Sequence, residues 1–198
     1  MDKKIKNIIF DLGGVLVGFD GQRSISSFEA LGCHDVAQYV VEHRTEDLFA
    51  DIELGRITTA EFCNEVRRIS GTNAKDSDII EAWNVLLTPM SAAKRQRLME
   101  LRQQGYRLFL LSNTNDMHWQ LCGYVFDIAP LFEHCFLSYE MHLIKPNEEI
   151  YREVLRQADI RAEETIFIDD NLDNIKAARR VGLHVFHNET PDAWLSEI

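Results

Sequence analysis

The sequence predicts an α/β fold: a doubly wound parallel sheet with a small helical insertion after its first strand. Two observations lead to this prediction. Short apolar runs typical of buried strands recur along the chain, and each is followed by a turn and a helical pattern. One early stretch breaks this alternation with helical patterns alone. Strands that alternate with helices imply right-handed crossovers, which give a parallel sheet covered by helices on both faces.

The apolar runs give five predicted strands, at residues 5–10, 107–111, 134–137, 165–168 and 183–186. Between them, the spacing of apolar residues predicts core helices at 91–104, 147–158 and 171–181. The first of these helices ends before Gly105 and the last before Gly182. Glycine suits the left-handed conformation in which many helices end, so these two boundaries are the best defined.

The interrupting stretch, residues 22–87, contains no convincing strand and predicts helices at 24–31, 36–44, 59–69 and 76–87. Thr58 or Thr59 is the expected N-cap of the third helix. We therefore expect an α/β core of residues 1–17 and 89–198 and a helical cap of residues 18–88. The alternative is a helical layer packed on one face of the sheet.

Composition narrows the possible partners. The 198 residues carry a formal net charge of -11, which disfavours nucleic acid and anionic membranes, since both are bound through fields of Lys and Arg. The four cysteines are scattered without the close spacing of a zinc site or a redox dithiol. No apolar run has the length of a membrane span or a signal peptide, so the expected location is the cytoplasm.

Polar residues gather where the predicted strands end. The first strand is followed by Asp11, the second by Ser112 and Asn113, and the fourth by Asp169 and Asp170. In an open parallel sheet, ligands bind at the carboxyl ends of the strands. A single Asp at such a place is often only a turn residue, but polar groups at successive strand ends indicate a shared site.

The types of these residues fit one kind of chemistry. Carboxylates bind hard divalent cations such as Mg²⁺, which in turn bridges to phosphate. Ser112 and the backbone N–H of Asn113, at the expected start of a helix, can bind phosphate oxygens. Lys145, before the helix that follows the third strand, can neutralise both the carboxylates and a transferred group. Asp11 can act as a covalent nucleophile that accepts a phosphoryl group.

Four segments together resemble the motifs of the haloacid dehalogenase (HAD) superfamily, in the order of that family and across essentially the whole chain. They are residues 8–16 (IIFDLGGVL), 110–114 (LLSNT), 144–146 (IKP) and 166–171 (IFIDDN) with Asn174. The insertion is similar to a small C1-type cap. The residues of these motifs resemble those of the bacterial glucose-1-phosphatase-like branch and of the phosphatase domain of soluble epoxide hydrolase.

The resemblance implies a role for each matching position. Asp11 would be the nucleophile and a metal ligand, the Gly13 carbonyl and Asp170 the other protein ligands of Mg²⁺, and Asp169 a contact of a metal-bound water. The group that holds the phosphoryl oxygens would be Ser112, Asn113 and Lys145. Asn174 stands where a second acidic residue is often found and receives no role.

Gly13 is the main departure from the family pattern. HAD phosphatases usually carry a second Asp two residues after the nucleophile, which protonates the leaving group and then activates water, and glycine does neither. The expected function is Mg²⁺-dependent hydrolysis of a small phosphorylated metabolite, such as a sugar 1-phosphate, by a monomer or homodimer. The alternatives are a catalytically weak binding or regulatory protein and a 2-haloacid dehalogenase.

The residues that would contact the substrate from the cap are less defined by the sequence. Six positions in or beside the insertion are candidates: Phe19, Asp20, Glu53, Arg56, Trp83 and Asn84.

Overall fold

The computed structural model describes residues 4–42 and 48–198, with the side chains of residues 39–42 excepted. A five-stranded sheet of order β5-β4-β1-β6-β7 forms the centre, and every pairing in it is parallel. Its strands are β1 (Asn7–Phe10), β4 (Arg107–Ser112), β5 (His134–Leu137), β6 (Thr165–Asp169) and β7 (His184–His187). The chain places β4 and β5 on one side of β1 and β6 and β7 on the other, which confirms the predicted doubly wound fold.

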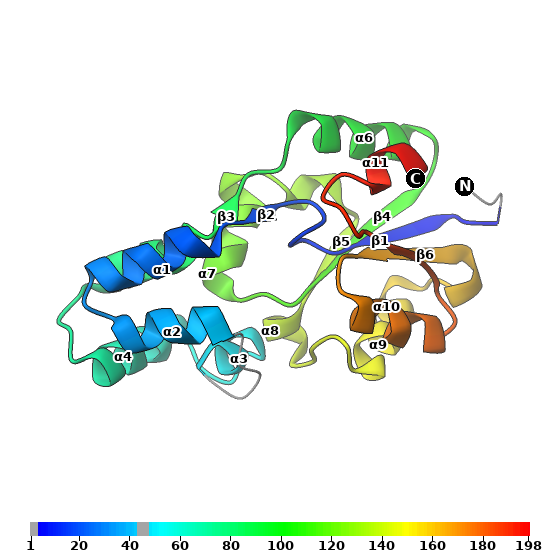
Figure 1. Cartoon of the computed structure of the whole chain (residues 1–198). Coiled ribbons are helices and arrows are strands. Elements are labelled where there is room, and N and C mark those ends of the chain that lie inside the picture. The colour runs from blue at the N-terminus through cyan, green and yellow to red at the C-terminus, as the bar shows by residue number, and fades with distance from the viewer. Residues whose placement is uncertain (1–3, 43–47) are drawn as a thin grey trace.

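Helices cover both faces of this sheet (Figure 1). On one face lie α6 (Ala92–Gln103) and α11 (Trp194–Glu197), and on the other α9 (Glu148–Ala158) and α10 (Leu172–Arg180). Because side chains alternate along a strand, the sheet separates two apolar cores. In β1 this alternation sends Phe10 into the core beneath α6 and α11, and Ile9 into the core beneath α9 and α10.

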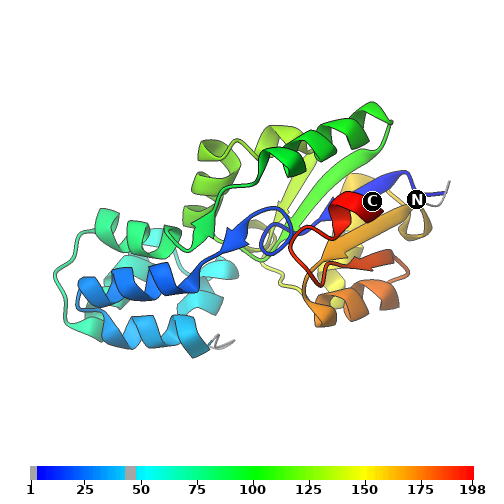
Figure 2. The ribbon, with the colours of Figure 1, turned by 45° about the horizontal axis from the view of Figure 1, so that its top comes forward.

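A block of helices lies beyond the end of the sheet at which β1 ends (Figure 2). It comprises α1 (Gly21–Ala30), α2 (His34–Glu42), α3 (Leu48–Glu53), α4 (Thr59–Ser70) and α5 (Asp76–Asn84). We call residues 21–84 the helical block. Its two connections to the sheet, β2 (Gly18–Phe19) and β3 (Leu87–Thr88), pair antiparallel.

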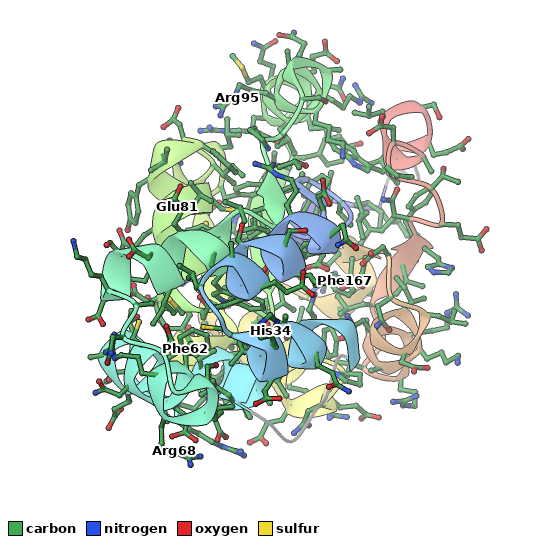
Figure 3. All side chains as sticks on the ribbon, turned by 60° about the vertical axis from the view of Figure 1, so that its left-hand side comes forward. His34, Phe62, Arg68, Glu81, Arg95 and Phe167 are labelled. Atoms are coloured by element: carbon green, nitrogen blue, oxygen red, sulfur yellow. The ribbon has the colours of Figure 1, made fainter. Side chains whose placement is uncertain are left out.

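Aromatic side chains fill the interior of the helical block. Phe28, Phe49 and Phe62 are buried, and all three rings contact Trp83. Figure 3 looks onto this block, with Phe62 inside it and the exposed Arg68 at its outer edge. The block therefore has its own packed interior.

Shorter elements complete the core. They are α7 (Asp116–Trp119), a π-helix (Gln120–Val125), α8 (Ser138–Met141) and two 3₁₀ turns (Ala129–Leu131 and Ala162–Glu164). None of these elements is predicted by the sequence pattern, and neither are α3, β2 and β3. No helix in the described part of the chain is both long and apolar enough to cross a membrane.

Several predicted boundaries shift for identifiable reasons. The first helix of the block begins at Gly21, because the Asp20 side chain accepts a hydrogen bond from the backbone N–H of Arg23. The helix predicted at 76–87 ends at Asn84, because Leu87 pairs with Phe19. The end of the helix predicted at 36–44 lies outside the described residues.

Candidate active site

The parallel sheet brings the predicted site residues together at one edge. Asp11 directly follows β1, and its backbone N–H donates to the carbonyl of Ile168 at 2.9 Å. Ser112 is the last residue of β4 and Asp169 the last of β6, and these two strands flank β1. The expectation that residues far apart in the sequence meet at the strand ends is thus confirmed.

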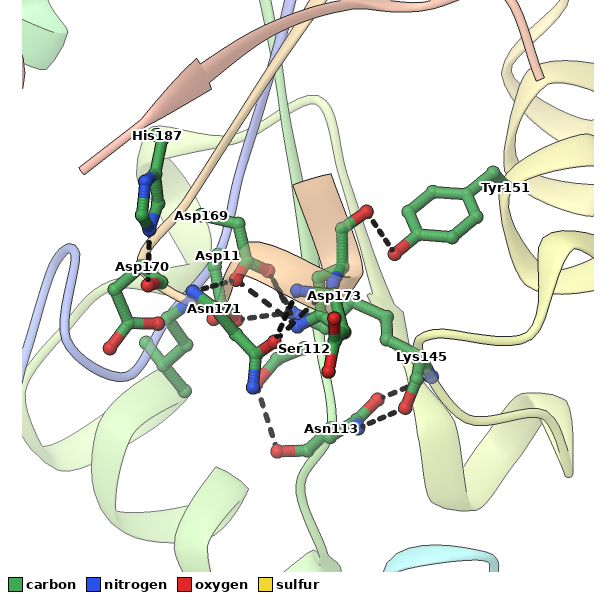
Figure 4. Close-up of polar contacts among 12 residues, drawn as sticks. Asp11, Ser112, Asn113, Lys145, Tyr151, Asp169, Asp170, Asn171, Asp173 and His187 are labelled. Carbon is green, nitrogen blue, oxygen red and sulfur yellow. Dashed lines mark hydrogen bonds and ion pairs between the residues drawn. The ribbon is translucent and has the colours of Figure 1, made fainter. Parts of the chain in front are cut away.

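Lys145 joins two of these carboxylates (Figure 4). Its Nζ lies 2.8 Å from Oδ1 of Asp11 and 2.7 Å from Oδ2 of Asp169. All three side chains are buried, the Asp169 side chain completely so. An ammonium group enclosed with two carboxylates balances one of their two negative charges.

Burial dominates the electrostatics of this group. It raises the pKa of Asp11 to about 8, assisted by the negative charge of Asp169 and opposed by Lys145. Burial also disfavours the charged form of Lys145, but Asp11 and Asp169 outweigh it and raise the pKa of the ammonium group. Burial raises the pKa of Asp170 as well, with Asp169 adding to the effect. Additional positive charge is needed to keep all of these carboxylates ionised together.

The three carboxylates fit a divalent cation. Oxygens of Asp11, Asp169 and Asp170 all lie within 4.8 Å of one another. Gly14 makes room for this arrangement, since a Cβ built on it would lie 2.0 Å from Oδ2 of Asp170. Gly14 also has a φ of +69°, a conformation that favours glycine. An all-oxygen set with a net negative charge matches the preference of Mg²⁺.

Asn174, which has no role in the sequence analysis, holds Asp169 in place. Its Nδ2 lies 3.1 and 3.0 Å from the two carboxylate oxygens of Asp169. The backbone N–H of Asn171 donates to the same carboxylate at 2.7 Å. Together with Lys145, these donors occupy both oxygens of Asp169. The signal in the sequence is the position of Asn174 in the first turn of the helix that follows Asp169.

Asn113 acts on Lys145 through the backbone. Its Oδ1 accepts a hydrogen bond from the Lys145 N–H at 2.9 Å, and its Nδ2 donates to the Lys145 carbonyl at 3.0 Å. The Ser112 hydroxyl lies 3.3 Å from the Asn113 carbonyl. The expectation that Ser112 and Asn113 stand at a helix start is wrong. The next helix, α7, begins only at Asp116, because Asn115 caps it.

A cavity of about 1150 Å³ separates these groups from the helical block. The strand ends contribute Ser112 and Asp170 to its wall, the loop before α9 contributes Lys145, and the helical block contributes Phe49 and Trp83. The cavity therefore opens between the carboxylate cluster and the inserted helices.

Three of the six candidate contacts from the insertion line this cavity: Phe19, Glu53 and Trp83. The other three do not line it. Asp20 caps α1, Arg56 forms an ion pair with Asp51, and the Asn84 side-chain oxygen is buried without a partner in the described structure. His118, which no motif in the sequence indicates, also lines the cavity and stacks on Trp83.

Gly13 faces Phe19 within this cavity. A Cβ built on Gly13 would lie 2.1 Å from Cζ of the Phe19 ring and 2.3 Å from its Cε2. The space that a side chain at position 13 would occupy is therefore filled by a phenyl ring.

Several known proteins are similar to this chain in sequence and fold. A D-ribitol-5-phosphate phosphatase of Bacteroides thetaiotaomicron is 29% identical over 201 residues, which cover 98% of this chain and 97% of that protein. A HAD family enzyme of the same organism, solved in complex with magnesium and inorganic phosphate, superposes with a TM-score of 0.86. It is 37% identical and the match covers 92% of this chain and 93% of that one. The magnesium bound by that enzyme is the cation that the sequence predicts for this chain.

A predicted HAD-like family hydrolase of Porphyromonas gingivalis superposes with a TM-score of 0.90 at 34% identity, covering 98% of this chain and 96% of that one. The family of haloacid dehalogenase-like hydrolases matches residues 5–182. Both the motifs at the strand ends and the fold that gathers them are those of this family. The chain is a hydrolase and belongs to the haloacid dehalogenase-like family.

Proposed function

We propose that this enzyme is a Mg²⁺-dependent phosphatase that hydrolyses a small phosphorylated metabolite through a phosphoryl intermediate on Asp11. The observation that carries the proposal is the buried Asp11 carboxylate, paired with Lys145 and within 4.8 Å of oxygens of Asp169 and Asp170. The ribitol-5-phosphate phosphatase and the magnesium- and phosphate-bound relative support the same chemistry.

Asp11 performs the covalent step. Its carboxylate oxygen attacks phosphorus, the bond between phosphorus and the ester oxygen breaks, and an aspartyl-phosphate forms. Because Gly13 has no side chain to donate a proton, the departing oxygen leaves as an anion or takes its proton from water. Water then attacks the aspartyl-phosphate, which releases inorganic phosphate and restores Asp11.

The surrounding groups hold the charges of this reaction. Asp11, Asp170 and the carbonyl of Gly13 are the proposed ligands of Mg²⁺, which when bound supplies positive charge beside the phosphoryl group. Asp169 has both oxygens engaged by Lys145, Asn171 and Asn174, which suits a contact to metal-bound water. It is not a direct ligand in this proposal.

Lys145 and the end of β4 bind the phosphoryl oxygens. Lys145 offsets the charge of the transferred group while it holds Asp11. Ser112 and the backbone N–H of Asn113 are the other proposed contacts, and the Asn113 side chain fixes the backbone of Lys145. Residues 18–88, which contain the helical block, form the proposed cap over this site.

Hydrolysis of phosphate esters with and without Mg²⁺ tests the proposal. We expect activity that requires Mg²⁺ in the parent and is absent in Asp11→Asn, since an amide is neither a nucleophile nor a good ligand for a hard metal. Asp159→Asn, a change to an exposed carboxylate near Arg107 at the start of β4, the opposite end of that strand from Ser112, is the matched control. Undiminished turnover in Asp11→Asn contradicts the mechanism. Binding of phosphate without turnover in the parent supports the alternative of a binding protein.

Within this class, we propose sugar 1-phosphates as the substrates. General acid catalysis contributes about 10²–10⁴-fold, and Gly13 does not provide it. This loss penalises alcohol leaving groups most, whereas the anomeric hydroxyl of a sugar is more acidic and leaves more readily. A series of aryl phosphates with graded leaving-group pKa should show a steep dependence of kcat/KM. A flat dependence contradicts the proposal, because it reveals another acid.

A further inference from the structure

The ring of Phe19 occupies the place beside the nucleophile that a side chain at position 13 would take. Its Cζ and Cε2 lie 2.1 and 2.3 Å from a Cβ built on Gly13. Gly13 does not have a positive φ, so its backbone does not require glycine. A side chain at position 13 would instead require the Phe19 ring to move. Gly13, two residues after Asp11, and Phe19 therefore form one steric unit.

Backbone hydrogen bonds hold the segment that carries this ring. Residues 12–17 form a tight loop, in which the N–H groups of Leu16 and Val17 donate to the Leu12 carbonyl and that of Gly14 donates to the Val17 carbonyl. Phe19 follows in β2 and pairs with Leu87 of β3. Figure 2 shows this segment running from the end of β1 to the helical block. The backbone of Phe19 thus lies between the loop that follows Asp11 and the connection to the block.

Phe19 nevertheless remains open to solvent, with 60% of its surface exposed. Among the large hydrophobic side chains that are exposed in the described residues, it alone lines the cavity. The others are Met99, Tyr124, Val125 and Leu172. An exposed aromatic ring beside a reactive carboxylate offers a flat apolar surface to whatever enters the cavity.

The wall of the cavity next to Phe19 is also mainly apolar. Ile25, Phe49, Trp83 and Leu86 contribute apolar surface, and Gln22 and Glu53 are the polar side chains that the described part of the helical block adds. The groups that can bind a phosphoryl group lie on the opposite wall, at the strand ends. A bound ester therefore has its phosphate on the polar wall and its leaving group against the apolar one.

We propose that Phe19 is a specificity-determining residue that selects phosphate esters with a cyclic leaving group, a sugar or aryl ring that lies flat on the Phe19 ring. Acyclic polyol phosphates lack a flat face and gain less from this contact. The inference rests on the proposed phosphatase function only for the placement of the phosphate. Beyond that function, the inference names the class of leaving group that is preferred and the residue that selects it.

The first test compares two pairs of esters in the Mg²⁺-loaded enzyme. We expect higher kcat/KM for phenyl phosphate and glucose 1-phosphate than for glycerol 3-phosphate and ribitol 5-phosphate. Phe19→Ala should lower this cyclic-to-acyclic ratio about tenfold, the size of a lost aromatic contact. Phe19→Leu, which keeps apolar volume but has no flat face, should lower it to a similar degree. Tyr124→Ala removes an aromatic ring of similar exposure outside the cavity and should leave the ratio unchanged.

A double-mutant cycle tests the steric unit. Gly13→Ala should displace the ring and lower the ratio as Phe19→Ala does, and the double variant should lower it no further. Thermal unfolding of each variant shows that it is folded. If the two substitutions lower the cyclic-to-acyclic ratio independently, so that their effects multiply in the double variant, the inference is overturned. It is also overturned if Phe19→Ala leaves the ratio unchanged.

A binding experiment separates this inference from the proposed function. Phenylphosphonate and propylphosphonate are not hydrolysed and differ in the ring. Phe19→Ala should weaken the binding of phenylphosphonate about tenfold and that of propylphosphonate less. Calorimetric titration in the presence of Mg²⁺ measures both dissociation constants. If no ester is hydrolysed but this difference is found, the proposed function fails and the inference stands. If esters are hydrolysed but both ligands respond equally to Phe19→Ala, the inference alone fails.

Discussion

At the scale of single residues, the site depends on how one fully buried carboxylate is held. Asp169 receives hydrogen bonds from Lys145, from the backbone of Asn171 and from the amide of Asn174. A buried charge is stable only when such partners compensate its lost hydration. Asn174 thus belongs to the site by supporting Asp169, although it points at neither of the other carboxylates.

We predict that Asn174→Leu weakens Mg²⁺ binding about 10–100-fold, as is typical when the supporting partner of a metal-site carboxylate is lost. The Leu side chain has similar volume but leaves the oxygens of Asp169 without two of their contacts. The Mg²⁺ dependence of activity and a calorimetric titration both measure the change. Lys176→Ala, an exposed position of the same helix, serves as the comparison, since Lys176 pairs with Asp173 and not with Asp169. Equal metal affinity in Asn174→Leu and the parent contradicts the prediction.

At the scale of the elements, local sequence explains where several helices begin. The helix α4 begins after Thr58, whose hydroxyl accepts a hydrogen bond from the Glu61 N–H at 3.2 Å. The Glu61 carboxylate accepts one from the Thr58 N–H at 2.8 Å, which completes a capping box. The helix ends at Gly71 in the left-handed conformation.

We expect Thr58→Ala to lower the free energy of unfolding by about 1 kcal/mol, because the orphan N–H groups of the first turn lose their acceptor. Thr58→Ser keeps the hydroxyl and should retain most of the stability. Chemical denaturation of the three proteins gives the difference. A loss in the serine variant as large as that in the alanine variant shows that the methyl group, not the cap, matters.

At the scale of the whole molecule, the helical block and the sheet meet at a buried histidine. His118 of α7 stacks on Trp83 of α5, with ring centroids 4.7 Å apart. Its Nε2 lies 3.4 Å from the Trp83 carbonyl and its Nδ1 lies 3.3 Å from Nδ2 of Asn115. A second junction joins the Ser138 hydroxyl to the Glu53 carbonyl at 2.6 Å. Contacts at these two places fix the position of the block over the cavity.

The burial of His118 makes this junction sensitive to acid. Burial lowers the pKa of His118 from 6.5 to about 4, despite the hydrogen bond to Trp83. Between these values the unfolded chain binds a proton that the folded protein does not. The contribution of His118 is therefore complete above pH 6.5 and falls as the pH drops towards 4, by up to about 3 kcal/mol.

We predict that His118→Phe, which keeps a ring against Trp83, shows a weaker loss of stability than the parent between pH 6.5 and 4. Denaturant titrations at several pH values measure the two slopes, and the titration of carboxylates is common to both proteins. Identical slopes mean that His118 does not titrate differently in the folded and unfolded states, which contradicts the assigned pKa.

The sequence by itself determined the sheet and the polar residues that stand where its strands end. Strand boundaries such as those of 134–137 were predictable because a short apolar run is a local signal. Asp11, Ser112 and Asp169 were predictable because parallel strands bring their carboxyl ends to one edge, and Lys145 because it lies in the connection between β5 and the core helix α9. The short helix α3 and the strands β2 and β3 gave no comparable signal, since they are too short to show a period.

Only the tertiary structure decided what fills the space around Asp11. From the sequence alone, Gly13 is only a position at which the usual second Asp is missing, and Asn174 is an amide without an assigned role. In the folded chain Gly13 admits the ring of Phe19, and Asn174 supports Asp169. These relations depend on distances between side chains on different elements. No local pattern encodes such distances, because they are set when the loop after β1, the strand β2 and the helix α10 pack around the same edge of the sheet.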